Sequence, residues 1–389
     1  MRRLHVLDWV GIGLFAAGAA AVAAGLLPVG EAEATVRRIA PLLAFLGAVI
    51  ILAELTARAE VFDVLADRLA TLARGRTVAL FAVCVGFAAL TTVTLNLDTT
   101  AVLLTPVMLA LARRLGLPPL PLAVTTVWLA NTASLLLPVS NLTNLLAAGH
   151  VGLGPVGFAG RMWLPQLAAI GVTAVALWLA YWRGTARRFT PPPAHRPRDL
   201  LLFRVALGAC LVFVAGVLLE VPLWLASGAA ALVVVGAFAW RDRAALRPGL
   251  LPWRLLVFVT GMFLVVETLG AHGLDRFAAT LIGSGGGTAG AFRAAATGMG
   301  LANLVNNLPA YIAGEGGIGP GQRTQLLALL IGVNVGPLAA PWASLATLLW
   351  WERCRAADVP VPPVRFLLSG AAVAVAGTAL ATAALLLGA

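Results

Sequence analysis

Two polar segments, each surrounded by apolar sequence, match one another at a fixed offset of 203 residues. The first covers residues 131–145 and the second covers 334–348, and no gap is needed to align them. The aligned pairs are Asn131 with Asn334, Pro138 with Pro341, Asn141 with Ser344, and Asn144 with Thr347. Apolar helices that are interrupted at corresponding places in two halves of a chain are typical of transporters built from repeats. The pair therefore predicts two broken helices, one in each half.

The apolar sequence around these segments predicts a membrane protein. Hydrophobic residues make up 60% of the chain and charged residues 11%, whereas a soluble domain has roughly 45–50% and about 25%. Apolar runs such as 9–27, 223–239 and 366–387 approach the ~20 residues that cross a bilayer as a helix. We expect an all-α polytopic membrane protein with nine spans and two hairpins, over 77–112 and 291–314.

The basic residues, all 27 of them arginine, predict the topology. If the N-terminus is cytoplasmic and each hairpin returns to its own side, 21 arginines face the cytoplasm and 6 face outward. Cytoplasmic loops of membrane proteins carry such an excess, so the net charge of +11 requires no nucleic-acid partner. We expect a multi-pass protein of the cytoplasmic (inner) membrane. The outer set is Arg37, Arg38, Arg161, Arg276, Arg293 and Arg323.

One polar stretch divides the chain. Residues 183–199 are rich in Pro and Arg, and because proline runs resist helix formation we expect a cytoplasmic linker there. Residues 1–182 form the first transmembrane repeat, 200–221 a connecting span, and 222–389 the second repeat, which enters the membrane in the opposite orientation. The sequence thus predicts an inverted-repeat transporter with two hairpins and two broken helices.

Polar residues within the apolar sequence are the candidate binding groups. Non-helical backbone at membrane depth is tolerated only inside protein or beside a water-filled cavity, and free helix ends offer partial charge to a solute. The same side chains could instead cap the broken helices or join neighbouring helices. The residues expected to line a substrate site are Asn131, Ser134, Ser140, Asn141, Asn144, Asn306, Asn307, Asn334 and Ser344.

Asp98 is the only carboxylate in these polar segments, and no arginine lies within one helical turn of it. Acidic residues inside a membrane are costly, and they often act as proton relays. We expect Asp98 to carry a coupling proton, although it could simply cap helix ends. Glu54 and Glu267 occupy equivalent places near the ends of corresponding spans, and they could take part in coupling or lie at the membrane interface.

The remaining reactive residues are scattered. The cysteines, at positions 84, 210 and 354, fall on separate segments, so neither a disulfide framework nor a metal site is predicted. The sequence contains no nucleophile–base arrangement, metal-ligand spacing or phosphate loop that would indicate an enzyme or a cofactor. The four histidines, for which no special role is expected, are His5, His150, His195 and His272.

The motifs together resemble those of the arsenite/antimonite permeases, the arsenical pump membrane proteins of the ion transporter superfamily. The resemblance covers most of the chain and is carried by residues 97–106, 131–134, 139–144, 303–309 and 332–337. It implies proton-driven export of trivalent arsenic or antimony, and hence arsenic resistance. Some such permeases work with a cytoplasmic ATPase, and superfamily relatives often form homodimers.

The chemistry of the polar segments favours an uncharged substrate. Arsenous acid is a neutral triol at neutral pH, and hydroxyl and amide groups without a cationic clamp suit it. A carboxylate or sulfate substrate would be favoured by arginine in the segments, although helix N-termini could replace it. The alternative function is therefore a sodium-coupled divalent-anion symporter, or a sodium/proton antiporter, both related to the permeases.

Overall fold

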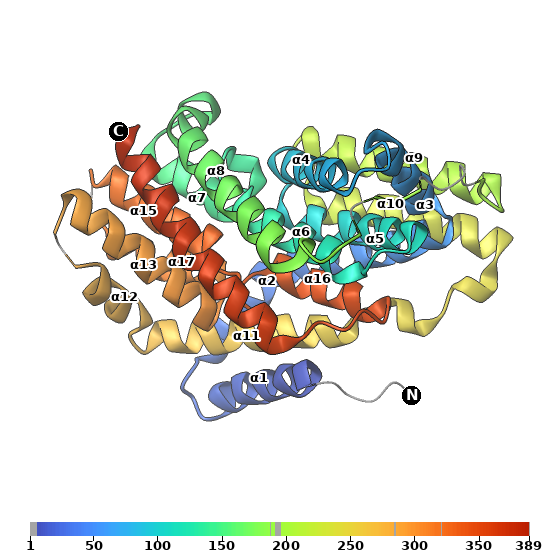
Figure 1. The fold of residues 1–389 in the computed structure, drawn as a ribbon. Coiled ribbons are helices and arrows are strands. Elements are labelled where there is room, and N and C mark those ends of the chain that lie inside the picture. Colours follow the sequence, from blue (N-terminus) through green and yellow to red (C-terminus); the bar gives the residue numbers. More distant parts are fainter. Residues whose placement is uncertain (1–5, 187, 191–195, 284, 320, 389) are drawn as a thin grey trace. The chain divides into compact units, whose positions relative to one another are not determined.

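The computed structural model describes residues 6–186, 188–190, 196–283, 285–319 and 321–388, and it contains seventeen α-helices in that part of the chain (Figure 1). The predicted linker is described only in part, because residues 187 and 191–195 lie outside the described residues, as do Arg2 and Arg3. The helices pack into two compact units, and each unit is discontinuous in sequence. The prediction of an all-α protein is confirmed.

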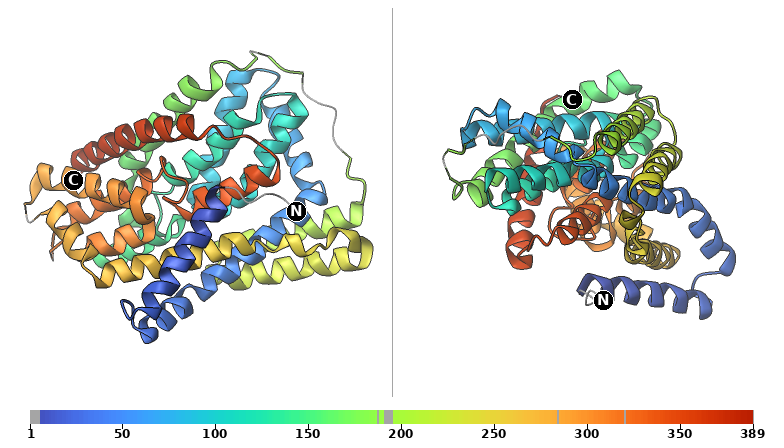
Figure 2. Two further views of the ribbon diagram at one scale, coloured as in Figure 1. Left: turned by 90° about the horizontal axis from the view of Figure 1, so that it is seen from below. Right: turned by 90° about the vertical axis from the view of Figure 1, so that its right-hand side faces the viewer.

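Unit 1 comprises Met1–Val61 and Arg196–Leu274. Its helices are α1 (Val6–Ala23), α2 (Val29–Arg58), α9 (Leu200–Leu218), α10 (Leu223–Arg241) and α11 (Trp253–Ala271). Helix α1 packs closely on α11, since a β-carbon at Gly261 would lie 2.3 Å from the backbone nitrogen of Phe15. Helices α9 and α10 lie side by side (Figure 2), and an ion pair of 3.5 Å joins Glu60 to Arg198.

Unit 2 comprises Phe62–His195 and Asp275–Ala389. Its helices from the first half of the chain are α3 (Val61–Leu72), α4 (Thr77–Leu95), α5 (Leu97–Leu115), α6 (Pro119–Thr132), α7 (Leu142–Val151) and α8 (Pro155–Leu177), which continues as a π-helical turn (Trp178–Trp182). Its helices from the second half are α12 (Leu274–Ile282), α13 (Gly287–Val305), α14 (Asn307–Glu315), α15 (Arg323–Val335), α16 (Leu345–Ala356) and α17 (Pro363–Leu387).

Seven of these helices, namely α2, α4, α8 with its π-helical turn, α9, α10, α11 and α17, are long and apolar enough to cross a membrane. Helices α6, α7, α15 and α16 are shorter because each predicted broken span is divided into two. The two hairpins are present as the pairs α4–α5 and α13–α14. The chain is thus a polytopic membrane protein.

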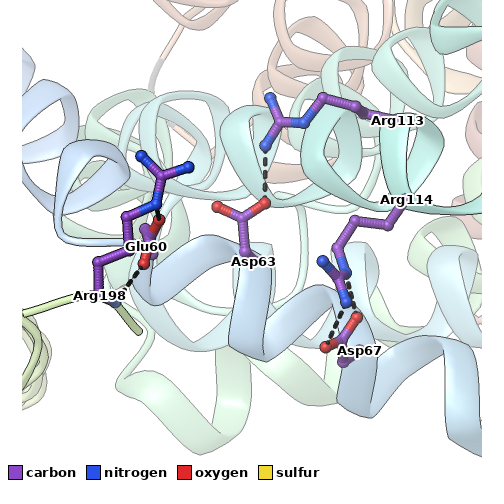
Figure 3. Close-up of polar contacts among 6 residues, drawn as sticks. All are labelled: Glu60, Asp63, Asp67, Arg113, Arg114 and Arg198. Carbon is purple, nitrogen blue, oxygen red and sulfur yellow. Dashed lines mark hydrogen bonds and ion pairs between the residues drawn. The ribbon is translucent and has the colours of Figure 1, made fainter. Parts of the chain in front are cut away.

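Close packing and ion pairs position the helices of unit 2. Helices α13, α15 and α17 pack on one another, and α17 also packs on α8 (Figure 2). Helix α3 is tied to the last turn of α5, where Arg113 lies 2.7 Å from Asp63 and Arg114 bonds Asp67 at 3.0 Å (Figure 3). Cations in a last helical turn also interact favourably with the helix dipole. These contacts fix the C-terminal end of α5, and the first turn of the same helix carries Asp98.

Candidate functional site

The two broken helices have matching local structure. Helix α6 ends at Thr132, and α7 begins after Asn141, whose side chain accepts a hydrogen bond of 3.2 Å from the Thr143 backbone N–H. Helix α15 ends at Val335, and α16 begins after Ser344, the N-cap residue that aligns with Asn141. We call residues 133–141 the first break and 336–344 the second break. The prediction of two broken helices is confirmed.

A buried amide joins the end of α15 to the first turn of α7. The Asn334 Oδ1 atom accepts hydrogen bonds from Asn141 Nδ2 at 2.9 Å and from Thr143 Oγ1 at 2.7 Å. The Asn334 Nδ2 atom donates to Asn144 Oδ1 at 2.6 Å. All four residues are buried, so this network connects the two polar segments away from solvent.

The same kind of contact occurs a second time with the halves exchanged. Asn131, which aligns with Asn334, donates through Nδ2 to Thr347 Oγ1 at 3.4 Å. Thr347 is the residue that aligns with Asn144. The Ser344 hydroxyl lies 2.9 Å from the same Thr347 oxygen. A reciprocal pair, in which one position contacts a second and the second contacts the first, is the pattern of a two-fold interface.

Side chains satisfy the backbone of the first break. Asn144 Nδ2 donates to the carbonyl oxygens of Ser134 (2.6 Å) and Leu137 (2.9 Å). Gln166, on α8, accepts from the Leu135 N–H at 2.8 Å, and the Ser134 hydroxyl donates to the Asn131 carbonyl at 2.7 Å. Because unpaired backbone groups are costly away from water, these residues hold the break in one conformation. The sequence analysis missed Gln166, whose sequence context carries no sign of this role.

Each hairpin turns at an asparagine with an unusual backbone conformation. Asn96 has φ 125° and ψ 169°, and Asn306 has φ 98° and ψ 153°. This region is almost exclusive to glycine, and a residue held there costs about 1–3 kcal/mol. Asn96 Oδ1 accepts from the Thr99 N–H at 2.8 Å, whereas Asn306 Nδ2 donates to the Trp342 carbonyl at 2.8 Å. Both hairpin turns are therefore held by their surroundings against local backbone preference.

Each hairpin is also bonded to the break of its own half. In the first half, the Ser140 hydroxyl donates to the Val93 carbonyl at 2.8 Å. In the second half, Trp342 Nε1 donates to the Asn303 carbonyl at 3.0 Å, and the Asn307 N–H donates to the Ala343 carbonyl at 2.8 Å. Val93 and Asn303 both lie three residues before the hairpin asparagine. The two halves thus share the contact between hairpin and break.

Asn303 is the residue that the sequence analysis overlooked in a segment it had singled out. Its Nδ2 donates to the Gly336 carbonyl at 2.8 Å, and its Oδ1 accepts from the backbone N–H groups of Ala339 (3.3 Å) and Ala340 (3.1 Å). One side chain on α13 therefore bonds three backbone groups of the second break. The signal available in the sequence was an amide one turn before a hairpin asparagine.

Four buried oxygen atoms near the first hairpin have no hydrogen-bond partner within the described residues. They belong to the first turn of α5 and the last turn of α6, two helices that pack on each other. A buried polar atom without a partner costs about 1–3 kcal/mol, and in a native structure it calls for an explanation such as an ion, a water or another function. The atoms are Asp98 Oδ1, Thr99 Oγ1, Thr100 Oγ1 and Asn131 Oδ1.

The predicted site residues divide between the two units. Asp98 and the nine amide and hydroxyl residues belong to unit 2, whereas Glu54 and Glu267 belong to unit 1. Glu267 bonds Arg38 at 2.5 Å, and Glu54 lies 3.8 Å from Arg58. Both glutamates thus have an arginine beside them, unlike Asp98. Within the part of the chain that the structure describes, no group of three or more His, Cys, Asp or Glu residues could hold a metal ion.

Comparison with known proteins places the chain in a family. The helices, hairpins and broken spans define a multi-pass membrane transporter of the secondary type, and a family model described as citrate transporter (CitMHS) matches residues 4–349. The chain belongs to this family.

Several relatives of this chain are arsenical pump membrane proteins. An arsenical pump membrane protein from Escherichia coli is 32% identical over 304 residues, which are 71% of this chain and 69% of the relative. Another, from strain K12, is 30% identical over 277 residues, 65% of this chain and 64% of the relative. The crystal structure of the YdaH transporter of Alcanivorax borkumensis aligns with a TM-score of 0.45 and 17% identity, over 98% of this chain and 97% of that one.

Proposed function

We propose that this protein exports arsenite and antimonite from the cytoplasm by proton antiport with alternating access. The observation that carries the proposal is the make-up of the two breaks and the hairpin turns, whose polar side chains are amides and hydroxyls together with a single carboxylate, Asp98. The name of the arsenical pump relatives supports the same substrate. Asp98 is proposed to bind the coupling proton, and the nine amide and hydroxyl residues are proposed to line the substrate site.

The free hydrogen-bonding groups suit a neutral triol. Arsenous acid presents three hydroxyl groups, each able to donate a hydrogen bond. The unpartnered Oδ1 of Asn131 and the hydroxyl oxygens of Thr99 and Thr100 can accept such bonds. No arginine lies in either break, and a neutral substrate requires none.

The second candidate is a divalent anion, which the citrate transporter description of the family favours. An anion would bind best at the N-termini of α7 and α16, where backbone N–H groups are available. Asn141 and Ser344 already accept hydrogen bonds from the Thr143 and Thr347 N–H groups at those ends. An anion at these ends would compete with the caps, whereas a neutral triol can donate to the unpartnered oxygens of Asn131, Thr99 and Thr100, so the neutral substrate is the better match.

An inverted repeat with a cytoplasmic N-terminus completes the proposal. The reciprocal contacts Asn334–Asn144 and Asn131–Thr347 support a two-fold relation between residues 1–182 and 222–389. The arginine distribution supports the orientation. In an inverted repeat, the two halves can exchange the side on which a central site is open.

Arsenite uptake into everted membrane vesicles tests the function. We expect a proton gradient to drive accumulation with or without sodium. Asp98→Asn should abolish uphill uptake and leave a folded protein, while Glu33→Gln, which alters an exposed carboxylate of α2, should behave as the wild type. Undiminished uphill uptake by Asp98→Asn would refute the coupling role, and sodium-driven uptake of citrate would favour the anion symporter.

A further inference from the structure

A second titratable cluster lies at the far ends of two half-helices. Glu315 is the last residue of α14, and His150 is in the last turn of α7. The His150 Nδ1 atom lies 3.3 Å from Glu315 Oε2 and 3.0 Å from the carbonyl oxygen of Leu146. Tyr311, one turn before Glu315, is fully buried. We call Tyr311, Glu315 and His150 the Glu315 cluster.

The polar groups of the cluster lie against one another. The Glu315 Oε2 atom and the Tyr311 hydroxyl oxygen are both buried. The Glu315 carboxylate interacts with the Tyr311 hydroxyl by its charge and by a side-chain hydrogen bond, so the two groups are neighbours. A charge that is partly removed from water is costly unless it is paired. The Glu315 carboxylate therefore depends on its contacts with Tyr311 and His150.

Among the described residues, no arginine contacts Glu315. The helices that pack on α14 are α7, α13 and α15. Apart from His150, their charged residues are Arg293 on α13, which bonds the Gly285 carbonyl, and Arg323, which is exposed at the start of α15. In the described residues, His150 is thus the only basic group in contact with Glu315, and histidine is the side chain that changes charge between about pH 5 and 8.

The half-helices connect the cluster to the breaks. Helix α7 begins at the first break with Asn141, and α14 begins beside the second break with Asn306. With ten and nine residues, each half-helix is about 15 Å long at 1.5 Å per residue. In the proposed topology the cluster lies on the outer side, because Arg161, Arg293 and Arg323 belong to the outer set. A proton that enters from outside would meet this cluster before it reached the breaks.

We propose that the Glu315 cluster binds the incoming proton on the outer side, as a second proton site in addition to Asp98. The inference rests on the proton antiport proposed above. The proton comes from water on the outer side and converts the Glu315 carboxylate to a neutral acid, which can donate a hydrogen bond within the cluster. It returns to water when the carboxylate is restored, so no other reactant is needed.

Everted vesicles containing the full chain test this site, because the outer face then lines the lumen and lumenal pH can be set when the vesicles are prepared. Two rates are measured: uphill arsenite uptake as a function of lumenal pH, and arsenite–arsenite exchange at equal pH, which moves no net proton. The variants are Glu315→Gln, Glu315→Asp and His150→Asn. The matched control is Asp275→Asn, which alters an exposed carboxylate in the first turn of α12.

We expect Glu315→Gln to lose uphill uptake and its dependence on lumenal pH while exchange continues at the wild-type rate. Glu315→Asp should restore the pH dependence, His150→Asn should shift it along the pH axis, and Asp275→Asn should match the wild type. The proposal is overturned if Glu315→Gln keeps the wild-type pH dependence, or if it loses exchange as well, since the residue would then be structural. Absence of proton-driven uptake in the wild type would refute the antiport itself.

Discussion

The two hairpin asparagines should respond differently to replacement by glycine. Glycine adopts the conformation of Asn96 freely, so Asn96→Gly should release about 1–3 kcal/mol of backbone strain. The substitution also removes the N-cap bond to Thr99, but glycine at an N-cap costs only a few tenths of a kcal/mol relative to asparagine. The net result should be a stabilisation of about 1–2 kcal/mol. Asn96→Ala keeps the strain and loses the cap, so it should destabilise by about 1 kcal/mol.

Asn306 provides the matched comparison. Its backbone is strained in the same way, but its Nδ2 also donates to the Trp342 carbonyl in the second break. Asn306→Gly leaves that carbonyl without its partner, at a cost of about 1–3 kcal/mol. This loss offsets the relief of strain, and we expect little net change in stability.

Thermal unfolding in detergent, followed by circular dichroism of the helices, measures these differences. A change of 1 kcal/mol shifts Tm by about 2–4 °C in a domain of 150–250 residues, and by less in a longer chain. We expect Tm to rise for Asn96→Gly, to fall for Asn96→Ala, and to change little for Asn306→Gly. If Asn96→Gly lowered Tm as much as Asn96→Ala, the backbone at position 96 would not be strained and the reasoning would be wrong.

Five further substitutions test other parts of unit 2 and unit 1. Asn303→Ala should destabilise by about 2–4 kcal/mol, because three backbone groups of the second break lose their partner, and it should also lower arsenite uptake. Asn303→Asp keeps the acceptor oxygen, so we expect an intermediate effect on thermal unfolding and on uptake. Gly332→Ala places a β-carbon 2.0 Å from a carbonyl oxygen of α13 and should cost about 1–3 kcal/mol in chemical unfolding, whereas Gly300→Ala, with open space around it, should not destabilise. Hydrogen bonds from the backbone and from Arg241 lower the pKa of Asp199. The contribution of the Asp199 carboxylate to stability is therefore present above the unfolded pKa of about 3.9, and it is lost as pH falls through the folded pKa. We expect Tm, measured from pH 6 to pH 3, to fall less steeply for Asp199→Asn than for the wild type.

The sequence was sufficient to predict the breaks because the signal is local. Each polar segment interrupts an apolar run with proline and with side chains that can pair the freed backbone groups, and the offset of 203 residues aligned Asn141 with Ser344, which are the N-cap residues of α7 and α16. The hairpins were predicted over 77–112 and 291–314, close to α4–α5 and α13–α14. The turn residues were not identified, because asparagine at positive φ depends on contacts such as Asn306–Trp342 that form only in the folded chain.

The partners of the site residues could not be predicted. Helical periodicity gives the buried face of a helix, but it does not say which helix covers that face. The bond between Asn131 and Thr347 spans 216 positions, and the Glu315–His150 contact joins two segments that have no common motif. For the same reason, His150 had no expected role. Each compact unit combines helices from both halves of the chain, an arrangement that local sequence patterns do not reveal.

The bridge between the two polar segments has a consequence for the synthesis of the protein. Asn144 receives its partner, Asn334, only after a further 190 residues, and Asn131 receives Thr347 after 216. At about 5–20 residues per second, the ribosome takes about 10–40 s to add them. Throughout that interval Asn131 and Asn144 lack the partners that the second half supplies, although the hydrogen bonds of the first break to Gln166 and within the first half can already form. The length of the gene thus sets a period in which a half-made chain is most exposed to misfolding and to proteolysis.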